Sequence, residues 1–134
     1  MKVNLEGKIA LVTGAACGIG QATADALAAN GARVIYADIN FTAAQQSAAR
    51  TARSLALPVD VADENQVATL MRKIIDRFGT LDILVNNAGI NTHQHRVKID
   101  QFPTEEWERI LKVDLTGLFF VSRAAAKVML AEKD

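Results

Sequence analysis

Short apolar runs alternate with longer helical patterns along the chain. The apolar runs are five or six residues long and end at glycine or polar residues, which is typical of strands buried in a parallel sheet. The stretches between them repeat apolar residues at helical spacing or are rich in alanine. The pattern predicts strands over residues 8–13, 33–38, 54–59 and 82–86, helices over residues 18–30, 41–53, 63–78 and 115–132, and a further helix that opens at Pro103 and Thr104.

The most regular of these helices has a signal at each end. Asp63 suits its N-cap, and Gln66 follows three residues later, as in a capping box. Gly79 suits its C-terminal end. Its apolar residues fall on one face, and they are Val67, Leu70, Met71, Ile74, Ile75 and Phe78.

Strands that alternate with helices in this way are typical of an α/β protein with a parallel sheet and helices on both faces. Right-handed crossovers leave few arrangements, and we expect a doubly wound, three-layer α/β/α fold with strand order 3-2-1-4. The length of 134 residues suits one domain over residues 1–134, and we expect the chain to stop before a fifth strand.

Composition removes several classes of partner. The net charge is zero, from 15 basic and 15 acidic residues, which gives no general attraction to nucleic acid or to anionic lipid. The apolar runs are far shorter than the roughly 20 residues that span a bilayer. The single cysteine, Cys17, excludes an internal disulfide and a cysteine-rich zinc site. We therefore expect a cytoplasmic protein that binds neither nucleic acid nor membrane.

Three glycines lie where the first strand turns into the first helix. Gly14, Gly18 and Gly20 have the spacing G-x-x-x-G-x-G. Glycine lets the backbone approach a ligand closely, and a helix N-terminus offers unpaired N–H groups and the positive end of its dipole. The combination favours a pyrophosphate-binding loop, which also contains Ala16, Cys17 and Ile19. The alternative is a glycine-rich turn without a ligand.

Acidic residues follow the second and third strands. Asp38 is placed to accept hydrogen bonds from both ribose hydroxyls of an adenosine and to repel a 2′-phosphate. No lysine or arginine follows it in residues 39–41, so NAD is favoured over NADP. Asp60 could meet an adenine edge. Either residue could instead be a turn or capping aspartate.

A run of Asn86, Asn87, Ala88 and Gly89 ends the fourth strand. Ligands of doubly wound sheets lie beyond the carboxyl ends of the strands, at the switch in strand order. The run is therefore a candidate part of the site, and its alternative is an asparagine-rich turn.

Over essentially all 134 residues the chain resembles the N-terminal half of the short-chain dehydrogenase/reductase family. The resemblance implies a Rossmann fold, NAD(H) or NADP(H) as cofactor, and hydride transfer between an alcohol and a carbonyl. By position, it implies that residues 87–89 lie behind the nicotinamide ribose and that the glycine loop holds the pyrophosphate. The features that carry it are Gly7-Lys8, residues 13–20, Asp38, Asp60-Val61, residues 86–89, Trp107, Val113 and Leu115-Thr116-Gly117. Val61, Ile39 and Val113 thereby join the expected cofactor-binding residues.

Asp114 departs from the family, which usually has Asn at this position. There the helix bends, and its backbone carbonyl helps to hold a water in the proton relay. Asp114 keeps that carbonyl and adds a carboxylate, which makes it the one catalytic candidate in the chain.

The family's catalytic Ser and its Tyr-x-x-x-Lys pair have no counterpart in these 134 residues. The only tyrosine is Tyr36, and Asn40 stands where the lysine would be. We expect an NAD(H)-dependent oxidoreductase at the level of the family and no catalysis by the chain alone. The alternatives are a non-catalytic dinucleotide-binding module or partner subunit, and a remnant that binds no cofactor.

Three further expectations complete the interpretation. His93 and His95 lie in a polar loop without the spacing of a metal site, so we expect no metal. The thiol of Cys17 is expected at the lip of the pyrophosphate site, with redox sensing as the alternative. We expect a homo-oligomer that forms through the exposed edge of strand four or the apolar face of the last helix. The substrate stays open.

Overall fold

The computed structural model describes residues 2–92 and 96–131. Its sheet contains parallel strands in the order β3-β2-β1-β4, which confirms the predicted arrangement. The strands are β1 (Ile9–Thr13), β2 (Arg33–Asp38), β3 (Leu55–Pro58) and β4 (Ile83–Val85). The helices are α1 (Gly18–Ala29), α2 (Phe41–Ala48), α3 (Glu64–Phe78), α4 (Thr104–Leu111) and α5 (Leu118–Ala131), with the 3-10 helix η1 (Ile99–Gln101) and the π-helix η2 (Lys112–Gly117).

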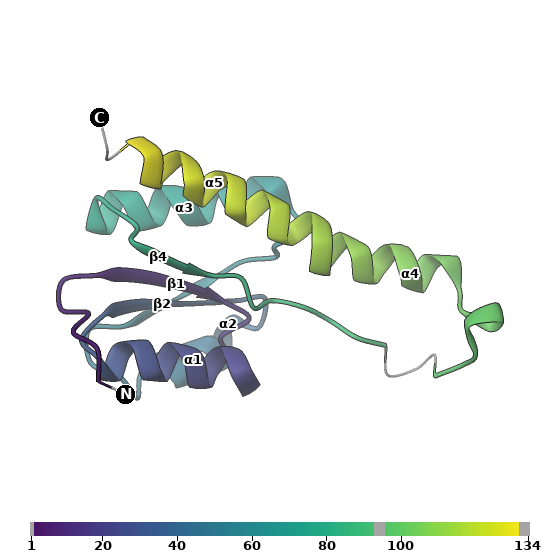
Figure 1. The fold of residues 1–134 in the computed structure, drawn as a ribbon, viewed down its shortest axis with the longest axis horizontal. Helices are drawn as coiled ribbons and strands as arrows, with labels where there is room; N and C mark the ends of the chain where they lie inside the picture. Colours follow the sequence, from purple (N-terminus) through teal and green to yellow (C-terminus); the bar gives the residue numbers. More distant parts are fainter. Residues whose placement is uncertain (1, 93–95, 132–134) are drawn as a thin grey trace.

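Helices cover the sheet on both faces, as Figure 1 shows, with α1 and α2 on one side and α3 and α5 on the other. Alternate residues of β1 face the two sides. Ile9 and Leu11 pack with the large apolar residues of α3 and α5, whereas Ala10 and Val12 pack with alanines of α1 and α2. The abundant alanine therefore lets α1 and α2 lie close to the sheet.

The two ends of α3 lie where the sequence predicts, but the capping box is only half formed, because the Gln66 side chain accepts from the Asp60 N–H and the Asp63 N–H donates to the Asp60 carbonyl oxygen. The Asp63 side chain accepts hydrogen bonds from the backbone N–H groups of Asn65 (3.0 Å) and Gln66 (3.2 Å). Gly79 ends the helix in the left-handed conformation, with a φ of 75°. The face that begins with Val67 is buried against the sheet.

The second helix is shorter than predicted. It ends at Ala48, whereas the alanine- and glutamine-rich pattern predicts a helix over residues 41–53. The hydroxyl of Thr51 binds the Ala48 carbonyl oxygen (3.2 Å), and Arg53 adopts a φ of 62°. These turns reverse the chain so that it enters β3 beside β2, which helix propensity alone does not reveal.

The last helix, predicted over residues 115–132, is observed as α5, but it does not begin anew near residue 115. The structure has one continuous helical rod in which η2 joins α4 to α5 (Figure 1). Gly117 is buried within η2, and a Cβ there would lie 2.7 Å from Cγ2 of Val61. Close packing against the chain after β3, rather than a helix start, explains this glycine.

β4 pairs with β1 and lies at the edge of the sheet over the described residues, as expected. Of the helices in residues 2–92 and 96–131, none is both long and apolar enough to cross a membrane.

Candidate functional site

A hollow of about 480 Å³ opens where the four strands end. It contains most of the residues that the sequence predicts for cofactor binding. Its lining consists of Gly14, Cys17, Ile19, Asp38, Ile39, Val59, Asp60, Val61, Asn87, Ala88, Gly89, Ile90 and Val113. No lysine or arginine of the described residues belongs to this lining. The structure therefore brings the separate motifs of the sequence into one concave surface.

The start of α1 faces this hollow without a side-chain cap. Cys17 occupies the N-cap position in an extended conformation, and its side chain accepts no hydrogen bond from the helix. The first turn of α1 also contains no acidic residue. Unpaired N–H groups and the positive end of the helix dipole are therefore available to an anion.

Glycine is required at two positions of the loop before α1 for steric reasons. A Cβ on Gly14, which has a φ of 66°, would lie 2.9 Å from the Cα of Ala88. A Cβ on Gly20 would overlap the carbonyl oxygen of Gly14. Gly20 thus lets α1 pack against its own loop, and neither it nor Gly18 nor Ala16 lines the hollow.

Asp38 connects the end of β2 to the glycine loop. One carboxylate oxygen accepts a hydrogen bond from the Ala16 N–H (3.0 Å), and the other accepts one from the Asn40 N–H (2.9 Å). The alternative interpretation of Asp38 as a turn or capping aspartate is therefore correct for the turn. It is not correct for the cap, because Asn40 is the N-cap of α2. Each oxygen keeps a lone pair, and the carboxylate is held in a fixed orientation at the hollow.

Two isoleucines beside these groups expose unusually large apolar surfaces. Ile19 is 80% exposed and Ile39 is 73% exposed, and both line the hollow. Exposed apolar side chains next to a few polar groups are typical of ligand sites, where the ligand covers them.

Asp60 and Val61 lie in the turn after β3. The Asp60 carboxylate accepts a hydrogen bond from the Ala62 N–H (3.0 Å), and its own backbone N–H donates to the side chain of Gln66 (2.9 Å). The turn alternative is again observed, and the residue also lines the hollow.

Asn87 and Thr13 lock the end of β4 to the end of β1. The Thr13 hydroxyl oxygen accepts from the N–H groups of Asn87 (3.1 Å) and Ala88 (3.0 Å). The Asn87 amide in turn donates to the carbonyl oxygens of Thr13 (3.2 Å) and Gly14 (3.1 Å). The Asn87 side-chain amide thus binds the backbone of the glycine loop and fixes the residues at the base of the hollow.

Asp114 lies in η2 and reaches the segment after β4. One of its carboxylate oxygens accepts a hydrogen bond from the Ile90 N–H (2.7 Å). A Cβ on Gly89 would lie 3.4 Å from that oxygen. π-Helical turns are frequent at functional sites, and here the turn carries Val113 into the lining of the hollow and Asp114 just behind it.

The sequence prediction missed two lining residues, Val59 and Ile90. Each directly adjoins a predicted motif, so the signal was their position next to Asp60 and Gly89. His93 and His95 lie outside the described residues. In the part of the chain that the structure describes, no group of three or more His, Cys, Asp or Glu side chains could hold a metal ion.

The fold and the glycine loop define a Rossmann-like α/β protein. The sequence profile of the family described as short chain dehydrogenase matches residues 8–134, and the chain belongs to this family. The crystal structure of gox2181 superposes with a TM-score of 0.91 at 31% sequence identity, and the match covers 98% of this chain and 52% of that one.

Curated relatives cover nearly the whole chain. An uncharacterized oxidoreductase, YxbG of Bacillus subtilis (strain 168), is 42% identical over 95% of this chain and 47% of its own length. The sorbitol dehydrogenase of Cereibacter sphaeroides is 38% identical over 96% of this chain and 50% of its own length. The 15-hydroxyprostaglandin dehydrogenase [NAD(+)] of Homo sapiens is 40% identical over 87% of this chain and 42% of its own length. The chain thus spans about half the length of the curated relatives it matches.

Proposed function

We propose that the hollow binds NAD(H) and that the chain forms the cofactor-binding part of an oxidoreductase acting on an alcohol or a carbonyl. One observation carries the proposal. The uncapped N-terminus of α1 and the carboxylate of Asp38 line the same hollow at the carboxyl end of a parallel sheet. Anion-binding N–H groups and a ribose acceptor in this arrangement suit a dinucleotide.

Each part of the hollow has a task in this proposal. The backbone N–H groups of Cys17 and Ile19, which line the hollow, bind the pyrophosphate, and Asp38 accepts hydrogen bonds from the adenosine ribose. Asp60 and Val61 adjoin the adenine, with the exposed Ile19 and Ile39 beside it. Residues 87–89 and Val113 lie at the nicotinamide end. The bound cofactor supplies or accepts the hydride.

Electrostatics favour NAD(H) over NADP(H). A 2′-phosphate would stand beside the Asp38 carboxylate, with Asp60 also on the lining and no cation of the described residues there to compensate. Among the relatives, the human 15-hydroxyprostaglandin dehydrogenase is named with NAD(+).

The 134 residues alone are proposed not to catalyse hydride transfer. A group that exchanges a proton with the substrate oxygen is required, which in this family is a tyrosine. The only tyrosine here is Tyr36, whose side chain is fully buried in β2 and whose hydroxyl donates to Asp25 (2.8 Å). For the isolated chain, this observation favours the second candidate function, a dinucleotide-binding module or partner subunit.

Two partners complete the proposal. The substrate is a small-molecule alcohol or carbonyl, since the relatives include a sorbitol and a galactitol 2-dehydrogenase. A second copy of the chain is proposed to cover the edge of β4 or the exposed residues Leu115, Leu118 and Phe119 on the rod of η2 and α5.

Titration of the purified chain with NADH, followed by the fluorescence of the reduced nicotinamide, tests the proposal. We expect saturable binding, and we expect ADP to compete because it carries the pyrophosphate and the adenosine ribose. Unsaturable signal, or saturable binding that excess ADP leaves unchanged, would contradict the assignment of these groups.

A further inference from the structure

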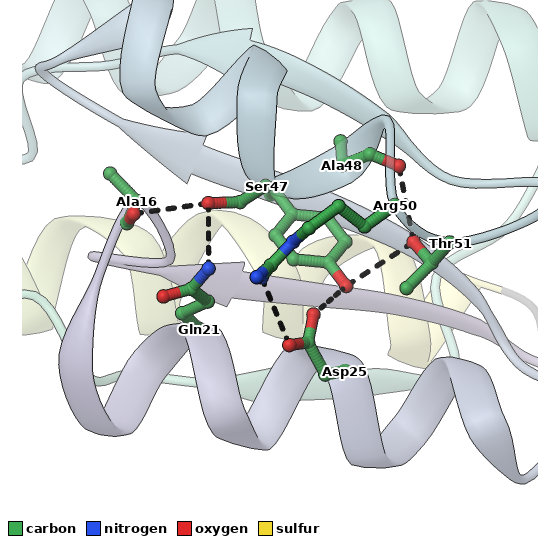
Figure 2. Close-up of polar contacts among 8 residues, drawn as sticks. Ala16, Gln21, Asp25, Ser47, Ala48, Arg50 and Thr51 are labelled. Atoms are coloured by element: carbon green, nitrogen blue, oxygen red, sulfur yellow. Dashed lines mark hydrogen bonds and ion pairs between the residues drawn. The ribbon is translucent and has the colours of Figure 1, made fainter.

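Ser47 of α2 is a buried polar residue that lies outside the hollow. The residue is 3% exposed. The Ser47 hydroxyl donates a hydrogen bond to the carbonyl oxygen of Ala16 (3.0 Å), in the middle of the glycine loop (Figure 2). The Gln21 side-chain amide lies 3.1 Å from the same hydroxyl oxygen.

The backbone of Ala16 is thereby held from two elements. Its N–H donates to Asp38 at the end of β2, and its carbonyl oxygen accepts from Ser47 in α2. The preceding residue is also fixed, because the Ala15 N–H donates to the carbonyl oxygen of Ala37 (3.2 Å). The loop therefore has little freedom between Gly14 and the start of α1.

Fixing the Ala16 carbonyl also fixes the next amide. The Ala16–Cys17 peptide bond is trans, so its N–H points in the direction opposite to its carbonyl group. Because the carbonyl points to Ser47, the Cys17 N–H points away from α2. Cys17 is the N-cap of α1 and lines the hollow, so its N–H is one of the donors available to an anion.

A second set of contacts holds α2 in place relative to α1. Asp25 of α1 accepts a hydrogen bond from the Tyr36 hydroxyl (2.8 Å) and pairs with Arg50 just after α2 (3.1 Å). Thr51 lies within hydrogen-bond distance of the same Tyr36 hydroxyl (3.3 Å). Figure 2 shows the two sets side by side between α1 and the end of α2. Ser47 therefore lies on a helix whose end is connected to α1 and β2 by further contacts.

We propose that Ser47 is a positioning residue of the dinucleotide site, which orients the Ala16–Cys17 peptide toward the pyrophosphate without touching the ligand. The proposal rests on the proposed function, since it assigns a supporting residue to that same site. The geometry predicts that removal of one hydroxyl, outside the hollow, weakens cofactor binding.

The test compares Ser47→Ala with Ser54→Ala in the full chain. The Ser54 hydroxyl is buried and has no hydrogen-bond partner among the described residues, so its removal is a matched control. NADH affinity is measured by calorimetry well below the melting temperature of each variant, and amide hydrogen exchange is measured in the ligand-free chains. We expect Ser47→Ala to weaken NADH binding about three- to tenfold, the size of one lost hydrogen bond, and Ser54→Ala to leave it unchanged.

Hydrogen exchange separates positioning from general destabilisation. We expect Ser47→Ala to accelerate exchange in residues 15–18 while β1 and β2 keep the exchange rates of the wild-type chain. Equal NADH binding by Ser47→Ala and wild type, or acceleration spread evenly over the sheet, would overturn the positioning role alone. Failure of the wild-type chain to bind NADH would overturn the proposed function together with this role.

Discussion

The Thr13 hydroxyl oxygen accepts hydrogen bonds from two successive backbone N–H groups, those of Asn87 (3.1 Å) and Ala88 (3.0 Å). Thr13 is 1% exposed, so its hydroxyl oxygen is not engaged by bulk water instead. The Thr13 side chain, together with the Asn87 amide, thus joins the ends of β1 and β4, where the strand order changes direction. The hollow lies beside this junction.

Replacement of Thr13 by valine, which has nearly the same shape, tests this junction. Two part-buried N–H groups lose their acceptor, and we expect a loss of about 1–3 kcal/mol in the free energy of unfolding. Urea denaturation measures the loss. Thr23→Val is the control, because the Thr23 hydroxyl only binds the Ile19 carbonyl at the surface of α1. If Thr13→Val loses no more free energy of unfolding than Thr23→Val, the proposed role of Thr13 in joining β1 to β4 is contradicted.

Asp114 is expected to stabilise the fold through the carboxylate oxygen that accepts the hydrogen bond from the Ile90 N–H. Asp114→Asn keeps an oxygen for the Ile90 N–H, whereas Asp114→Ala leaves that part-buried N–H without a partner. We expect the alanine variant to lose about 1–3 kcal/mol of stability and the asparagine variant less than about 1 kcal/mol. Denaturation of both variants under the same conditions decides the point, and equal losses would argue against this hydrogen bond.

Burial raises the pKa of Tyr36 to about 12 from its ordinary value of 10.0, and the carboxylate of Asp25 acts in the same direction. Between pH 10 and 12 the unfolded chain therefore loses this proton while the folded chain keeps it. Stability from this group is fully present below pH 10 and falls as the pH rises toward 12, by up to about 1.4 kcal/mol per pH unit.

Tyrosinate absorbance measures the Tyr36 titration directly, because the chain contains one tyrosine. We expect a midpoint near 12 in the folded chain and near 10 in urea. Tyr36→Phe should remove this component of the loss of stability at high pH. A midpoint near 10 in the folded chain would show that the hydroxyl is not held as described.

Cys17 offers a chemical probe of the hollow. Its thiol is exposed and its residue lines the hollow, so bound NADH is expected to slow alkylation by iodoacetamide. The measurement is the labelling rate by mass spectrometry with and without saturating NADH. Because Cys17 is the only cysteine, the signal has one source. Equal rates at proven saturation would remove Cys17 from the site.

Local signals predicted much of this molecule. The bounds of β2 and both ends of α3 follow from β-branched residues, the Asp63 cap and Gly79. The motifs around Asp38 and Asn87 end parallel strands, so strand order alone brings them together. The end of α2 was not predictable in this way, because the residues that follow it turn back and place Thr51 against Tyr36 of β2, a tertiary contact that a helical pattern does not reveal. Ser47 was missed for the same reason, since a serine in a helix gives no sign that it binds a loop 31 residues away.

The most direct test of the central claim is a calorimetric titration of the chain with NADH and with NADPH, for wild type and for Asp38→Ala. We predict saturable NADH binding, clearly weaker NADPH binding, and about a 10- to 100-fold loss of NADH affinity in the variant through lost charged hydrogen bonds. We also predict that Asp38→Ala reduces the difference between the affinities of the chain for NADH and for NADPH. Equal affinities of the wild-type chain for both, unaffected by Asp38→Ala, would contradict the account.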